Sequence, residues 1–421
     1  MATSTEFEKA TDFTLKESDI ERAKALVGHY SASKTREHLT MGSHDTFRNF
    51  ARSYGDDNPL FCSEEYGTTT RWGSQIAPPM VGIGLNAPLL ADPPTEHLKR
   101  PSFRGIHVFV SGSTWDWYRP VLPGDRLYSF GGTESVEVKD SEFAETSVLI
   151  TFLNTKMNQR GEVVASMRML AIHTERKTAR EKGKYSALEP ATYTDDDMAR
   201  LDAIYAAEQV RGGEPRWWED VNEGDELPPL VKGPMRVTDM VVWHTGMGMG
   251  LYGVAALRLG HDQLQRMPRF FKPDDLNIPD VQQRVHWDPE WARRAGNPTC
   301  YDYGRMRETW LIHLCTDWMG DDAWLWKLDC QFRKFNYVGD THWMRGRVTR
   351  KYVVEQDRPA VDLEVWGENQ RGEKTTPGHA TVLLPSREHG EVRLPLPPGG
   401  ATTCQEALDA LADRFAAEEL Q

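Results

Sequence analysis

Runs of β-forming residues separated by turn residues dominate the first part of the chain. Apolar and β-branched residues are frequent at 126–130, 147–152 and 163–165, and such runs favour strands. Between the last two runs lies Asn-Gln-Arg-Gly-Glu at 158–162, where Gly161 suits a turn that needs a positive φ. We therefore predict a hairpin there. A second predicted turn, Pro-Gly-Asp at 123–125, leads into the first of these strands.

Other stretches space their apolar residues as a helix does. In residues 195–208, Met198, Leu201, Ile204 and Tyr205 fall on one face, which predicts an amphipathic helix. The same spacing occurs at 251–264, at 310–314 and at 404–419. We expect the last of these to pack on the protein or to contact a second copy.

The chain also contains an internal repeat. The pentapeptide at 158–162 recurs unchanged at 369–373, and Gly-Asp at 124–125 recurs at 339–340. Further upstream, Glu-Tyr-Gly at 65–67 corresponds to Glu-Trp-Ala at 290–292. Matches in the same order with a slowly drifting displacement indicate a duplication. Each half then has a helical section followed by three or more antiparallel strands, an α+β arrangement in which a curved sheet wraps a helix.

The repeat also sets the expected domain boundaries. We expect a first domain at 15–175, a charged crossover segment at 176–235, a second domain at 236–386 and a tail at 387–421. The crossover segment is rich in Lys, Arg, Asp and Pro, and we interpret it as a connection rather than as a third domain.

Composition excludes several classes of protein. With 39% hydrophobic and 27% charged residues among 421, the chain has the balance of a globular protein. A net charge of −13 disfavours nonspecific binding to nucleic acid. No apolar stretch approaches the roughly 20 residues that cross a membrane, and the N-terminus lacks the apolar core of a secretory signal. We therefore expect a cytoplasmic protein with no membrane partner.

The cysteines point to no special chemistry. Five of them are widely spaced without a CxxC pair, so neither a disulfide framework nor a zinc site is predicted. We expect reduced thiols and no metal.

The first half resembles the N-terminal domain of the MaoC-like hydratase/dehydratase family. The matching segments are 26–28, 50–51, 55–61, 76–80, 117–121, 123–125 and 162–165. The resemblance implies a tandem double hot-dog fold, in which two curved antiparallel sheets each wrap a central helix. It also implies hydration or dehydration of an acyl-CoA thioester such as an enoyl-CoA, with no cofactor other than the CoA that the substrate carries.

The first half departs from the family at its catalytic loop. In active members a loop Gly-Asp-x-Asn-Pro-Leu-His supplies an Asp and a His that move protons while water adds across the double bond. Here Asp56 and Asn58 match, but Phe61 stands at the His position. Hydration needs a base for the water and an acid for the α-carbon, so the first half lacks a complete pair. Residues 56–58 are also strong turn formers in their own right.

The second half carries the His that the first half lacks. Val-His-Trp-Asp-Pro-Glu-Trp-Ala at 285–292 is similar to the family's His-x-Asp-x-x-x-Ala segment, so the resemblance assigns the catalytic His to His286. The family's Asp would fall at Val281, and the nearest acid is Asp280, one residue earlier. Asp288 is a second candidate, although the family uses its equivalent structurally. His244 is a candidate substrate-binding residue that could also serve as a further acid or base, and it also fits a hydrogen-bonded core residue.

Gly304 stands where the central helix of the family begins. Hot-dog hydratases polarise the thioester carbonyl with backbone N–H groups at this end of the helix, where the dipole favours negative charge. The first-half counterpart, 77–80, contains two prolines, which have no N–H. Tyr303 and Arg305 are predicted substrate-binding neighbours. Arg333 and Lys334 are candidates for the CoA phosphates, as are Arg119 and Arg307, and each also fits a solvated loop.

The residues thus favour a lyase with one working site, in which the first half shapes a tunnel for the acyl tail. Two alternatives remain open at this point. One is a non-catalytic acyl-thioester-binding subunit, and the other is a hot-dog thioesterase that uses Glu308 on the central helix. Whether two chains form a homodimer also stays open.

Overall fold

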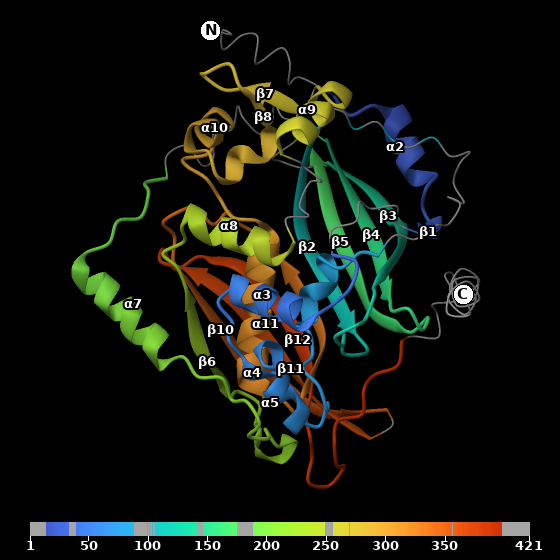
Figure 1. Cartoon of the computed structure of the whole chain (residues 1–421), viewed down its shortest axis with the longest axis vertical. Coiled ribbons are helices and arrows are strands. Elements are labelled where there is room, and N and C mark those ends of the chain that lie inside the picture. Colours follow the sequence, from blue (N-terminus) through green and yellow to red (C-terminus); the bar gives the residue numbers. More distant parts are fainter. Residues whose placement is uncertain are drawn as a thin grey trace.

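Ten strands form one continuous antiparallel sheet in the computed structural model. The model describes residues 14–32, 39–87, 99, 101, 103, 106–140, 146–174, 188–248, 256–268, 270–355 and 357–397. The strand order is β1-β3-β4-β5-β2-β9-β12-β11-β10-β6. The first five strands come from the first half of the chain and the last five from the second (Figure 1).

The strands of the two halves are as follows. Those of the first half are β1 (Tyr30–Ala32), β2 (His107–Trp117), β3 (Tyr128–Asp140), β4 (Thr146–Met157) and β5 (Val163–Thr174). Those of the second half are β6 (Glu226–Lys232), β9 (Trp324–Gln331), β10 (His342–Val354), β11 (Arg358–Asn369) and β12 (Lys374–Leu383). A separate two-stranded sheet consists of β7 (Phe271–Pro273) and β8 (Pro279–Val281).

The helices fall into three groups. The first half has α2 (Glu17–Lys24), α3 (His44–Ser53), α4 (Pro59–Cys62), α5 (Glu64–Thr69) and the 3₁₀ helix η1 (Pro79–Ile83). The connection has α7 (Asp195–Ala207) and η2 (Trp218–Asp220). The second half has α8 (Val237–Gly246), α9 (Leu257–Arg266), η4 (Gln282–His286), α10 (Pro289–Arg294) and α11 (Gly304–Met319).

The helix α11 is the core of the second half. It has 16 residues, and every residue from Met306 to Met319 is buried. The strands β6 and β9–β12 curve behind it, while α3, α4 and α5 of the first half lie over its other side (Figure 1). The equivalent place in the first half begins with η1, whose first residue, Pro79, has no N–H to donate. Residues 88–98, which follow it, lie outside the described residues.

The two repeated motifs meet each other in space. Gln159 Nε2 donates to Asp125 Oδ1 at 3.2 Å, and Arg160 pairs with the same oxygen at 3.0 Å. In the second half, Gln370 Nε2 donates to Asp340 Oδ1 at 2.6 Å, and Arg371 Nη1 donates to it at 2.8 Å. Each Asn-Gln-Arg-Gly-Glu hairpin therefore clamps the Gly-Asp turn of its own half. The repeated residues therefore make the same structural contacts in both halves.

The two halves join edge to edge through β2 and β9. The pairing runs from Gly112 opposite Gln331 to Asp116 opposite Lys327. Gly112 is needed there, because a Cβ would lie 2.5 Å from the carbonyl oxygen of Cys330. Trp324 Nε1 also donates to Trp117 O across the joint at 2.9 Å. A single hydrophobic core contains residues of both halves, so the two halves pack as one unit.

Most of the predicted elements are present. Both hairpins form as predicted, with Gly161 at φ 74° and Gly372 at φ 70°, and α7 occupies the predicted helix at 195–208. The described part of the predicted helix at 251–264 is α9. Within the segment 176–235, β6 pairs with β10 and forms one edge of the sheet. The predicted helix at 404–419 lies outside the described residues.

No helix in the described ranges is both long enough and apolar enough to cross a membrane.

Candidate active site

His286 ends the short helix η4 and lies at the beginning of α11. Its side chain is buried, and its Nδ1 lies 2.7 Å from the carbonyl oxygen of Tyr301. A carbonyl only accepts hydrogen bonds, so Nδ1 carries the ring proton. The other nitrogen, Nε2, is then left with a lone pair. The contact therefore holds a neutral imidazole in the tautomer that a general base requires.

A stack of aromatic rings surrounds this imidazole. The rings of His286 and Tyr303 are 4.0 Å apart, and Tyr303 in turn stacks on His244 of α8 with ring centres separated by 4.5 Å. Burial lowers the pKa of His244 to about 4, and its buried Nε2 has no hydrogen-bond partner within the described ranges. Tyr303 thus separates the two imidazoles. His244 and Tyr303, both predicted substrate-binding residues, lie next to the predicted catalytic His.

The N-terminus of α11 offers backbone donors next to His286. Tyr303 is the N-cap residue, and its side chain makes no capping hydrogen bond. The first N–H groups of a helix have no partner inside it, and those of Gly304 and Arg305 therefore point out of the helix end. Together with the helix dipole, they favour negative charge at this point. Predicted base and predicted oxyanion donors thus meet at one place.

An ion pair that sequence reasoning missed supports the same helix end. Arg307 Nε lies 2.9 Å from Asp302 Oδ2, and both side chains are almost fully buried. Arg307 Nη1 also donates to Lys334 O at 2.7 Å, and Asn336 donates to Asp302. Burial raises the pKa of Asp302 to about 6, against the opposing effect of Arg307. Its only signal in the sequence was an acid two residues before Gly304 and an arginine three after it.

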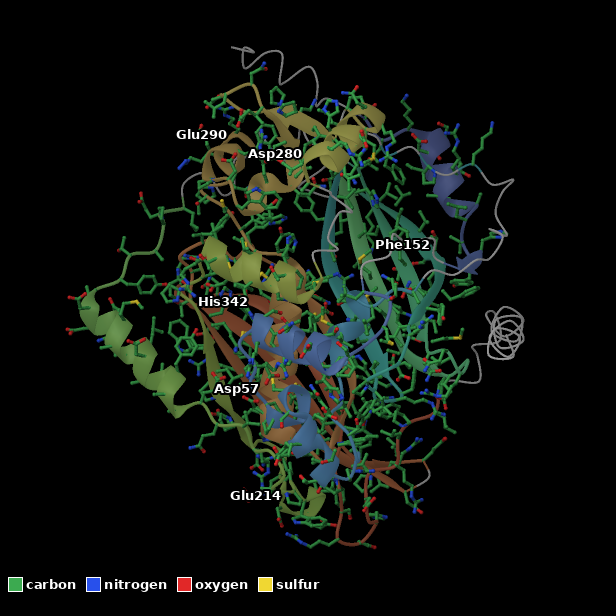
Figure 2. All side chains as sticks on the ribbon, in the orientation of Figure 1. Asp57, Phe152, Glu214, Asp280, Glu290 and His342 are labelled. Carbon is green, nitrogen blue, oxygen red and sulfur yellow. The ribbon has the colours of Figure 1, made fainter. Side chains whose placement is uncertain are left out.

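The predicted acids Asp280 and Asp288 bind other groups than His286 among the described residues. Asp280 is on β8, opposite Lys272 of β7, and its Oδ1 accepts from the N–H of Val281 at 2.6 Å. Figure 2 shows it at the end of the molecule that holds β7, β8 and α10. No hydrogen bond or ion pair between described residues joins it to His286. Asp288 caps α10 by accepting from Trp291 N at 3.0 Å and lies 3.6 Å from Arg284.

The predicted phosphate-binding residues differ in how accessible their side chains are. Arg305 turns toward the first half, where its guanidinium contacts the sulfur atoms of Met167 and Met169 and lies 3.7 Å from Glu308. Arg307 is held in the buried pair. Lys334 is exposed and pairs with Glu373. The side chain of Arg333 is exposed. Of these four, Arg333 and Lys334 remain accessible enough to meet a phosphate.

The equivalent place in the first half holds an apolar cavity. Phe61 is buried and lines it together with Pro78, Pro79 and Trp117, beside Met319 at the C-terminal end of α11. Arg119 also lines the space, and its guanidinium lies 3.4 Å from Glu162. The hydrogen bonds of the Asp56 loop are those of a turn, since Asn58 N donates to Asp56 Oδ1 and Leu60 N to Asn58 Oδ1.

Comparison with known proteins agrees with this architecture. Residues 25–167 match the model of the FAS1-like dehydratase domain region. A solved MaoC-like dehydratase superposes with a TM-score of 0.56 at 18% identity and covers 86% of this chain and 99% of its own. A MaoC domain protein dehydratase from Chloroflexus aurantiacus gives 0.53 at 12% identity, with 86% and 96% covered. This chain has the double hot-dog fold of the MaoC-like dehydratases. The predicted fold is therefore confirmed.

One curated relative matches part of the sequence. A "Probable enoyl-CoA hydratase alpha subunit" from Thermomonospora curvata is 27% identical over 163 residues. The match covers 36% of this double hot-dog chain and 51% of that protein, so this chain spans about half the length of the relative.

Glu308, the acid considered for a thioesterase, is bound at the joint between the halves. Its Oε1 accepts from Ser113 Oγ and from Trp115 Nε1, the latter at 2.8 Å, and both donors are on β2. The side chain is fully buried, and burial raises its pKa. A carboxylate held this way ties α11 to the first half, and its donors compete with any water that it would activate.

The ring of Phe332 leaves no room for a side chain at position 304. A Cβ at this position would lie 2.7 Å from Cδ2 of the Phe332 ring. We expect Gly304→Ala to lower the free energy of unfolding by about 1–3 kcal/mol, the usual cost of overpacking. The check is a urea titration of both proteins. Adding Phe332→Leu should restore much of the loss, and an unchanged midpoint in the single variant would contradict the tight contact.

Proposed function

We propose that the protein hydrates enoyl-thioesters and dehydrates 3-hydroxyacyl-thioesters, with one working site at His286. The observation that carries the proposal is the position of His286. A neutral imidazole with a fixed tautomer lies beside the uncapped end of a buried helix. A base and oxyanion donors at one point are what hydration of a conjugated thioester requires.

The chemistry follows from these two groups. His286 Nε2 removes a proton from water as its oxygen bonds to the β-carbon. The π electrons move toward the thioester carbonyl, whose oxygen gains negative charge beside the N–H groups of Gly304 and Arg305. The protonated imidazole then returns its proton to the α-carbon, which completes the addition. This one-base scheme needs no carboxylate at His286, and Asp280 takes no part in it.

The same geometry sets the acid limit of activity. Burial lowers the pKa of His286 to about 4, and the contact with Tyr301 only partly opposes this. The base form is neutral, so activity is present above the folded pKa and lost as pH falls through it. We expect kcat/KM to be level above about pH 5 and to fall tenfold per unit below about pH 4. A rate profile, limited to pH values at which circular dichroism is unchanged, checks this. An acid limb centred near 6.5 would contradict it.

The reaction class is tested by two assays on one sample. Loss of the conjugated thioester absorbance measures hydration, and a thiol reagent measures free CoA. We would use short, long and cyclic enoyl-CoA substrates. Hydration without thiol release supports the proposal, while thiol release without hydration would identify a thioesterase.

A second candidate is an acyl-thioester-binding subunit that works beside a catalytic partner. One observation favours it, namely that no carboxylate in the described ranges is bonded to His286. Binding of enoyl-CoA by calorimetry, without turnover on any substrate, would replace the hydratase proposal by this one.

A further inference from the structure

A second group of buried polar side chains lies at the middle of α11, away from its N-terminus. His313 and Asp317 are one turn apart on this helix, so their side chains share one face. Asp56 approaches them from the loop of the first half, and Glu208 from the end of α7. Asp56 and His313 are fully buried, and Asp317 is 6% exposed. The proposed hydratase chemistry uses none of these residues.

The distances in this group are those of ligands around a small cation. His313 Nε2 lies 3.2 Å from Asp317 Oδ2, 3.5 Å from Glu208 Oε1 and 3.7 Å from Asp56 Oδ1. Ligands about 2.0–2.1 Å from a tetrahedral zinc ion are separated from one another by roughly 3.4 Å. One ligand atom each of Asp56, His313 and Asp317 lies within 4.8 Å of the other two. These separations are compatible with one shared cation.

Buried atoms without hydrogen-bond partners also support a bound cation at this point. Of the described side chains around this point, none makes a hydrogen bond of good geometry to His313 Nε2 or to either carboxylate oxygen of Asp317. Buried polar atoms normally have a partner, because leaving them unpaired costs free energy. The orientation of Asp56 is also fixed from behind, since Asn58 N donates to Oδ1 at 2.9 Å and Tyr54 OH to Oδ2 at 3.2 Å. Such supporting bonds are typical of metal ligands.

Acidic side chains outnumber basic ones around this point. Asp56, Asp317 and Glu208 bring three carboxylates, and the facing base is Lys232 of β6, whose Nζ lies 2.7 Å from His313 Nδ1. Lys232 contacts the other ring nitrogen, so Nε2 can hold a cation only when Nδ1 carries the ring proton and donates it to a neutral Lys232 amine.

We propose that Asp56, His313 and Asp317 bind a divalent transition-metal cation of the zinc type, with Glu208 beside it. One imidazole with carboxylates suits such an ion better than Mg²⁺, which prefers an octahedral set of oxygens. The ion would bind the first-half loop to the central helix of the second half. Its role is structural and independent of the proposed reaction at His286.

The experiment measures metal binding by the full chain without a histidine tag. After treatment with a chelator and its removal, the protein is titrated with Zn²⁺ by calorimetry, and bound metal is counted by mass spectrometry after gel filtration. We expect one Zn²⁺ per chain and a rise in melting temperature. Asp317→Asn should weaken binding at least tenfold. The matched control is His379→Gln, an exposed histidine of β12, which should bind as the wild type does.

A wild-type spectrum with Co²⁺ keeps the proposal testable if Asp317→Asn does not fold. Tetrahedral coordination by nitrogen and oxygen gives intense visible bands, whereas hydrated Co²⁺ gives weak ones. Substoichiometric Zn²⁺ on the wild type, or equal binding by a folded Asp317→Asn protein, would overturn the proposal. Loss of binding in His379→Gln would do the same, by assigning the metal to the surface.

Discussion

Replacing His286 with alanine is expected to lower kcat for enoyl-CoA hydration by about 10²–10⁴-fold, the usual contribution of a positioned acid–base group. The physical reason is the loss of the Nε2 lone pair, which the Tyr301 contact directs toward the substrate. KM should change little, because the N–H groups at the start of α11 remain. Initial rates at saturating substrate measure the effect.

The control for this variant is His379→Ala, which removes an exposed imidazole from β12. It should keep the wild-type rate. Circular dichroism and gel filtration should show that His286→Ala is folded, since the side chain fills buried space. A folded His286→Ala protein with more than a tenth of the wild-type rate would remove His286 from the chemistry and assign the reaction to another group.

Arg307→Met is expected to cause the largest loss of stability, about 3–5 kcal/mol. The substitution leaves the carboxylate of Asp302 buried without its ion pair, and it also removes the bond from Arg307 to Lys334 O. Methionine keeps much of the side-chain volume, so packing changes less than charge. The loss should shrink as pH falls toward about 6 and be small below it, because a protonated Asp302 needs no counter-ion. Urea unfolding at several pH values measures both effects.

The double variant Asp302→Asn/Arg307→Met separates charge from packing. Because no unpaired charge remains buried, the double variant should regain much of the stability that Arg307→Met loses. Equal stability of the single and double variants would show that the ion pair contributes little. In that case Arg307 would again be a candidate for substrate binding.

The general architecture was accessible from the sequence because its signals are local. The two Asn-Gln-Arg-Gly-Glu hairpins need a glycine at positive φ, and the apolar spacing of α7 is regular. The repeat then indicated two similar halves. The neighbourhood of His286 and Gly304 followed from a resemblance that matches segment by segment, and the structure brings the two together.

The remaining parts of the site depend on contacts between distant segments. Nothing local shows that Glu308 meets Ser113 across the joint, or that Arg305 turns toward Met167. The assignment of Asp280 as the partner of His286 rests on counting residues alone, and the pairing of β8 with β7, which places Asp280 opposite Lys272, was not visible from the sequence. His313 and Asp317 could have been noticed as an i, i+4 pair. Their third partner, Asp56, is 257 positions earlier than His313 and reaches them only in the folded chain.

The continuous pairing of β2 with β9 has a consequence for how such a protein can change. In an assembly of two identical chains, any substitution appears in both sites at once, so a histidine cannot be lost from one and retained in the other. A single polypeptide that holds both halves in one sheet removes that symmetry. Phe61 and His286 can then coexist at equivalent positions, and selection can act on each site separately.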